Sequence, residues 1–164
     1  MSFPTFIAIE AATQELDSPP LHIAWSLPTG EIKQARIAAD ESWTQEDQPL
    51  WEADAAEAYA PAEIVREFLY DQQDEVLYLT EMMPAEAWLS RLFDAAGQEM
   101  SFELQPAAEL IGDASLWQQT YRETLDFLGL DPERAEDQVR ALLEVHVLLS
   151  GEQPEISSES AADF

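Results

Sequence analysis

The beginning of the chain contains three short stretches whose apolar residues follow the pattern of β-strands. Residues 3–12 are a mostly apolar run, which is typical of a buried strand. From Leu21 to Leu27, apolar residues occupy every second position, so one face of that strand is predicted to lie in the core. A turn at residues 28–30 leads into a third strand at 31–39. Because only short turns separate them, the three strands are predicted to form an antiparallel meander.

The rest of the chain is dominated by helical spacing. Four stretches with apolar residues at helical intervals predict helices, and they begin near Pro61, Pro84, Trp117 and Asp131. Two short apolar runs, 76–79 and 102–104, predict strands between them. Gly97 and Gly129 are suited to end the second and third helices. A meander followed by helices and further strands predicts an α/β domain, with a mixed sheet covered by helices.

Two segments depart from these periodic patterns. Residues 40–59 are acidic and irregular, and residues 151–164 are polar and acidic. The sequence shows no internal repeat and no linker between domains. We therefore expect residues 1–150 to form one domain, followed by an acidic flexible tail at 151–164.

The charge of the chain narrows the classes of partner that it can bind. Asp and Glu number 34 against seven Lys and Arg, so the net charge is −27, and Lys33 is the only lysine. A field of this sign repels the phosphates of nucleic acids and attracts basic surfaces. One interpretation is that the charge serves solubility or growth in high salt. The other is that an acidic face fits a cationic groove on a partner.

Several kinds of chemistry are excluded by residues that the chain lacks. Without cysteine there is no disulfide, no thiol nucleophile and no Cys-based zinc site. With only five glycines, a glycine-rich loop for nucleotides is not expected. No run approaches the ~18 apolar residues of a membrane span. We expect a cytoplasmic protein that does not associate with membranes.

The order of the predicted elements and the residues Phe6 to Glu10 (Phe-Ile-Ala-Ile-Glu) resemble the DEDDh 3′–5′ exonucleases. The segment 21–30 resembles the second strand and hairpin of that family. The segment 76–93 resembles its strand and helix with the middle aspartate, and 145–149 resembles its helix with the histidine. The resemblance extends from residue 6 to residue 146. It implies a ribonuclease H-like fold.

In this family two divalent ions, held by carboxylates, activate the attacking water, and a histidine serves as general base. The family's first motif, Asp-x-Glu, has Ala8 at its first position here, so only Glu10 remains. The middle aspartate would fall at 83–85, where no residue is acidic. The histidine corresponds to His146, and the last aspartate, five positions later, to Gly151. The resemblance leaves two relic positions, Glu10 and His146, which we expect to face one cleft, and no bound metal or other cofactor.

Each relic position also has a simpler interpretation. Glu10 could be a solvated residue at the end of a strand, because acidic residues are mostly exposed. His146 lies on the apolar stripe of the last predicted helix, so it could be a core residue and not a base.

Two functions from different classes follow. The favoured one is a catalytically inactive, exonuclease-like protein that acts by protein binding, as an acidic mimic of nucleic acid or an inhibitor of a basic, nucleic-acid-binding partner. Phages and mobile elements use such proteins against host defence, anti-CRISPR proteins among them. This interpretation predicts no direct binding of nucleic acid, and a homodimer is possible. The alternative is a weak Mg²⁺- or Mn²⁺-dependent 3′–5′ exonuclease or phosphodiesterase that uses Glu10 and His146, with Glu81 or Glu86.

The acidic segment 40–59 is the expected partner-binding site. Aromatic side chains are common anchors in protein interfaces, whereas aromatic platforms for nucleic acids come with Lys and Arg. The candidate residues are Trp43, Glu46, Asp47, Trp51, Glu52, Asp54 and Tyr59. A second possibility is that these aromatic residues pack the segment onto the sheet. Trp88 and Trp117, at helical spacing with apolar residues, are predicted to lie in the core.

Overall fold

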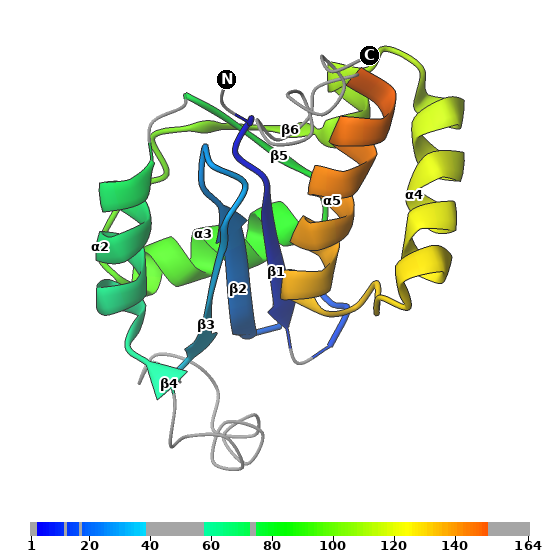
Figure 1. Cartoon of the computed structure of the whole chain (residues 1–164). Helices are drawn as coiled ribbons and strands as arrows, with labels where there is room; N and C mark the ends of the chain where they lie inside the picture. The colour runs from blue at the N-terminus through cyan, green and yellow to red at the C-terminus, as the bar shows by residue number, and fades with distance from the viewer. Residues whose placement is uncertain (1–2, 12, 17, 39–57, 73–74, 151–164) are drawn as a thin grey trace.

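The computed structural model of the chain describes residues 3–11, 13–16, 18–38, 58–72 and 75–150 (Figure 1). The strands are β1 (Ile7–Ala11), β2 (Pro20–Ser26), β3 (Ile32–Ile37), β4 (Ala58–Tyr59), β5 (Val76–Leu79) and β6 (Glu103–Pro106). The helices are α2 (Pro61–Asp71), α3 (Ala85–Ala95), the short 3₁₀ helix η3 (Ala107–Leu110), α4 (Ala114–Leu128) and α5 (Ala135–Ser150). Every strand and helix predicted from the sequence is present. β4 and η3 were not predicted.

The described strands form a four-stranded mixed sheet in the order β1-β2-β3-β4 and a two-stranded sheet of β5 and β6, which an isolated bridge joins beside β1. β1 pairs with β2 and β2 with β3, both antiparallel, so the predicted meander is confirmed. On its other side, β1 approaches β5 through a parallel bridge between Phe6 and Tyr78, and the Tyr78 N–H donates to the carbonyl of Thr5 (3.0 Å). β5 pairs with β6 in parallel, and β4 pairs with β3 in parallel. The strand predicted at 76–79 therefore pairs with β6 and is linked to the start of β1 by one bridge.

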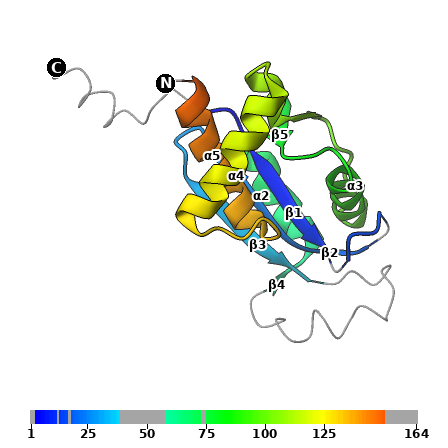
Figure 2. The same cartoon turned by 90° about the vertical axis from the view of Figure 1, so that its right-hand side faces the viewer.

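Alternation along β1 sends side chains into two separate cores. Ile7 and Ile9 lie in a core with residues of α2 and α3. Phe6 and Ala8 lie in a second core with residues of α4 and α5. Figures 1 and 2 show the same arrangement, with α4 and α5 on one face of the sheet and α3 on the other. The predicted α/β class, with a mixed sheet covered by helices, is confirmed.

Helix ends show where local signals succeeded and where they did not. Asp113 caps α4 by accepting from the Leu116 N–H (3.0 Å), and Gly129 ends that helix with φ of 66°, as predicted. The last helix, however, begins at Ala135 and not at Asp131 as predicted. Residues 131–134 instead form a turn in which the Asp131 N–H donates to the Asp137 carboxylate (2.9 Å). This turn shifts the helix start by one helical turn.

The helices among the described residues are not of the membrane-spanning kind. None of them combines the length and the apolar character that a membrane span needs.

Candidate functional site

A cavity of about 630 Å³, here called the Glu10 cleft, opens where β1 ends. Four segments that are distant in the sequence contribute to it: the end of β1, the segment before and into α3, the middle of α4, and the turn before α5. Its lining residues with polar or aromatic groups include Glu10, Glu81, Trp88, Trp117, Tyr121 and Glu133. Strand β1 and helices α3, α4 and α5 contribute part of this lining, and the loops and turns beside them contribute the rest.

Glu10 uses its carboxylate to hold the start of α5. Its Oε2 atom accepts a hydrogen bond from the Ala135 N–H at 2.6 Å. Ala135 is completely buried, so this N–H has no access to solvent as a substitute partner. The first N–H groups of a helix lack partners within the helix, and a carboxylate there also interacts favourably with the helix dipole. Glu10 therefore acts as a cap that links β1 to α5.

His146 lies far from Glu10, so the expected meeting of the two in one cleft is wrong. The residue is 7% exposed, and its ring packs edge-on against Phe3 and Phe6 with ring centres 6.0 Å and 5.9 Å apart. It follows Ala135 by eleven positions in the same helix, a separation of about 16 Å along the axis. Because α5 runs antiparallel to β1, Glu10 contacts the first residue of the helix and Phe6 contacts its last turns. His146 is part of the core beside the opposite end of β1.

The residues that face Glu10 from α5 belong to the start of this helix. The Asp137 carboxylate accepts from the Asp131 N–H and so stabilises the turn. Pro132 lines the cleft but has no group that can take up a proton.

The two further carboxylates considered for the alternative function are placed differently. Glu81 lies in the cleft lining, just after β5. Glu86 sits in the first turn of α3 and is not among the lining residues. In the described part of the chain, no group of three or more His, Asp or Glu side chains is arranged to hold a metal ion. The residues present do not fit the two divalent ions that the family resemblance implies.

The aromatic lining of the cleft was not predicted as part of a site. Trp88 and Trp117 are 5% and 4% exposed, so their predicted place in the core is confirmed, yet both also line the cleft. Trp117 stacks on Tyr121 with ring centres 5.0 Å apart and planes 11° apart. Burial, and to a smaller extent the charge of Glu81, raise the pKa of the Tyr121 phenol well above its ordinary value. The four-residue spacing of Trp117 and Tyr121, which puts them on one helix face, was the available signal.

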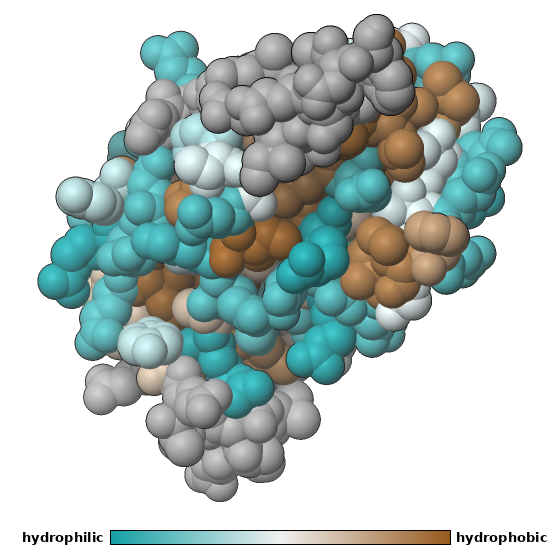
Figure 3. Space-filling model, viewed as in Figure 1, coloured by the Kyte–Doolittle hydropathy of each residue, from teal (hydrophilic) through white to brown (hydrophobic). Residues whose placement is uncertain are grey.

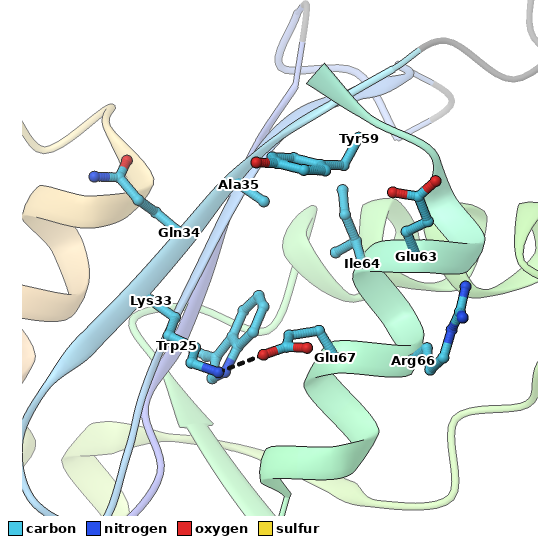
Figure 4. Close-up of a pocket in the computed structure, with 9 residues that line it drawn as sticks. All are labelled: Trp25, Lys33, Gln34, Ala35, Tyr59, Glu63, Ile64, Arg66 and Glu67. Atoms are coloured by element: carbon cyan, nitrogen blue, oxygen red, sulfur yellow. Dashed lines mark hydrogen bonds and ion pairs between the residues drawn. The ribbon is translucent and has the colours of Figure 1, made fainter. Parts of the chain in front are cut away.

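A second cavity, of about 680 Å³ and here called the Tyr59 groove, lies between β3, β4 and α2 (Figure 4). Tyr59 is 53% exposed and faces the groove with Trp25 and Ile64. Tyr59 is the one described member of the partner-binding set predicted from the sequence. The other members lie outside the described residues: Trp43, Glu46, Asp47, Trp51, Glu52 and Asp54.

Lys33 is bound on the wall of the Tyr59 groove. Its Nζ atom is 2.6 Å from Glu67 and 2.8 Å from Asp71, and Asp71 also accepts from the Trp25 indole N–H (3.1 Å). Two hydrogen bonds raise the pKa of Lys33 above its ordinary value. The bond to Asp71 has the larger effect and the bond to Glu67 the smaller. This cation is therefore already neutralised by the protein itself.

Replacing Lys33 with methionine is expected to lower the free energy of unfolding at neutral pH by less than about 1 kcal/mol, because solvent screens this half-exposed cluster. A raised pKa means that the stabilisation is present below the unfolded pKa of about 10.4 and is lost as the pH rises through the folded pKa. The gap in free energy of unfolding between the wild-type protein and Lys33→Met should therefore shrink only at alkaline pH. Urea unfolding near pH 7 and near pH 11 measures it, with Arg66→Met in the same groove as control. A gap that stays constant into alkali would contradict the argument.

Comparison with known proteins adds only weak structural likeness. No family model matches the chain, and no curated protein matches it. Among solved structures, exonuclease X in complex with 5′ overhanging duplex DNA is similar, with a TM-score of 0.48 and 15% identity over 93% of this chain and 96% of that chain. At these values the likeness carries no inference about activity or ligands. The observed sheet covered by helices fits the ribonuclease H-like, exonuclease-like class predicted from the sequence.

Proposed function

We propose that the chain is a degenerate relative of the DEDDh exonucleases that binds another protein and does not cut nucleic acid. The observation that carries the proposal is the role of Glu10. The acidic residue retained from the family's first motif is hydrogen-bonded to the Ala135 N–H of α5. Of the positions that the resemblance aligns with the family's other metal ligands, Ala8 and residues 83–85 carry no carboxylate, and His146 lies at the other end of α5. Under this proposal the protein needs no metal cofactor.

The charge of the chain supports a basic partner. A net charge of −27 opposes contact with phosphates, whereas nuclease surfaces must attract them. Hydrophilic residues cover much of the face seen in Figure 3, with hydrophobic patches between them. Such a surface suits fast, salt-sensitive association with a cationic groove. The proposed function is therefore that of an acidic mimic of nucleic acid or an inhibitor, of the kind represented by phage anti-defence proteins.

A nuclease assay tests the catalytic half of this proposal. Labelled single-stranded DNA and RNA are incubated with the protein and either Mg²⁺ or Mn²⁺. We expect no shortening above the protein-free blank and no retention of either nucleic acid on the protein. Shortening from the 3′ end that is abolished in Glu81→Gln would instead support a metal-dependent phosphodiesterase. Glu81 is the suitable position because it is exposed in the cleft, so its replacement should not disturb folding.

A displacement assay tests the binding half. A basic nucleic-acid-binding protein is loaded with a labelled duplex, and the acidic chain is added. We expect release of the duplex at about 50 mM salt and clearly less release at about 200 mM, since both steps depend on charge. Polyglutamate of equal net charge is the control for nonspecific competition. Release by polyglutamate at the same concentration would argue against a shaped binding surface.

A further inference from the structure

The Glu10 cleft combines three carboxylates with an aromatic wall. Among its lining residues, Glu81 and Glu133 are exposed and Glu10 is half-buried. Trp117 and Tyr121 form a stacked pair beside them. The cavity of about 630 Å³ falls within the range of ~300–1,000 Å³ that is common for ligand pockets.

No cation of the chain balances these carboxylates inside the cleft. All seven Lys and Arg residues fall within the described parts of the sequence, and none of them lines the cavity. Neither His22 nor His146 lines it either. In the Tyr59 groove, by contrast, Lys33 is held between two carboxylates. The negative charge of the cleft is therefore open to a cation from outside the molecule.

The aromatic pair makes the cleft more selective than an exposed cluster of acidic side chains. Cations are attracted to the faces of aromatic rings, and this attraction grows when water is displaced. Tyr121 is half-buried, so a group that contacts it loses part of its hydration. Burial, and to a smaller extent the nearby charge of Glu81, raise the pKa of the Tyr121 phenol.

We propose that the Glu10 cleft receives an arginine side chain of a basic partner protein. This inference rests on the proposed function and names one contact through which the acidic chain recognises its partner. Arginine fits better than lysine, because a planar guanidinium can stack on Tyr121 while its N–H groups reach carboxylates such as Glu81 and Glu133. A nucleotide is disfavoured at the same place, since its phosphates would face three carboxylates.

The direct test uses a capped triarginine peptide as probe. Its dissociation constant is measured by calorimetry at about 150 mM salt, where exposed charges more than ~8 Å apart are largely screened. We expect the peptide to bind more tightly than a capped trilysine peptide of equal charge. Equal affinities for the two peptides, or no binding of triarginine, would overturn the inference.

Matched variants locate the binding site. Glu81→Gln and Glu133→Gln should each weaken triarginine binding by about three- to tenfold, and Tyr121→Leu by a similar factor. Glu109→Gln removes the same charge from the exposed side of η3, outside the cleft, and should change the affinity less than about twofold. If Glu109→Gln weakened binding as much as Glu81→Gln, the general charge of the protein would explain the affinity and the inference would fail.

These outcomes separate the inference from the function on which it rests. If triarginine does not bind the cleft but the protein still displaces the duplex in a salt-dependent way, the proposed inhibitor function stands. Only the proposed arginine site is then refuted. If the protein binds triarginine tightly and also shortens oligonucleotides, arginine binding in the cleft is supported and the proposed loss of catalysis is refuted.

Discussion

Replacing Phe68 with alanine is expected to lower the free energy of unfolding by about 3–5 kcal/mol, the usual cost of removing a buried phenylalanine. Phe68 is 1% exposed in the middle of α2. Its ring packs edge-on against Trp25 at 5.4 Å, Phe93 at 6.0 Å and Phe102 at 5.5 Å. The variant therefore loses transfer energy, leaves a cavity and breaks three ring contacts at once.

Tyr70 provides a matched control two positions further along α2. It is 86% exposed, so Tyr70→Ala should change the stability by less than about 0.5 kcal/mol. Urea unfolding followed by tryptophan fluorescence measures both variants, since Trp25 lies against the Phe68 ring. A loss below about 1 kcal/mol in Phe68→Ala would show that this cluster does not hold α2 on the sheet.

The local elements of this fold could be predicted because each is specified by nearby residues. Alternation from Leu21 to Leu27 predicted β2, and the apolar run at 76–79 predicted β5. Gly129 marked the end of α4, because its left-handed backbone is accessible to glycine at little cost. β4 escaped prediction because a strand of two residues has no period to detect.

The relation between distant elements could not be predicted in the same way. Counting positions along the resemblance placed the histidine at His146, which assumed that the end of α5 faces Glu10. Packing decides this instead, since Ala135 binds Glu10 and His146 packs on Phe3 and Phe6. Nothing in the local pattern of a helix states which of its ends approaches a given strand.

The cleft forms only where segments that are distant in the sequence meet in the fold, and a single sequence does not show which segments meet. Trp88 and Trp117 were correctly predicted as buried from their spacing, but their shared cavity arises only when α3 and α4 approach the end of β1. The surroundings of Ala8 are also set by elements that are distant in the sequence. Ala8 is 3% exposed in the core formed with Ala135 and Val139, so its side chain is enclosed by apolar neighbours. An aspartate there would be buried among apolar side chains, at a cost unless a cation accompanied it.

Glu10 is therefore expected to behave as a structural residue when it is replaced. Glu10→Ala removes the acceptor of the buried Ala135 N–H and should lower the free energy of unfolding by about 1–3 kcal/mol, the cost of leaving such a donor unpaired. Glu10→Gln keeps an oxygen in place and loses only the charge beside the helix start, so about 0.3–1 kcal/mol is expected.

Urea unfolding gives both values, and hydrogen exchange at the Ala135 amide reports on the bond itself. A ligand position of a metal site would behave in the opposite way, because removing one of several crowded carboxylates relieves their mutual repulsion. Stability that rises in Glu10→Ala, with no faster exchange at Ala135, would restore Glu10 as a metal ligand and refute its role as a cap. A fall in stability larger for Ala than for Gln would instead show that Glu10 serves to hold α5 against β1.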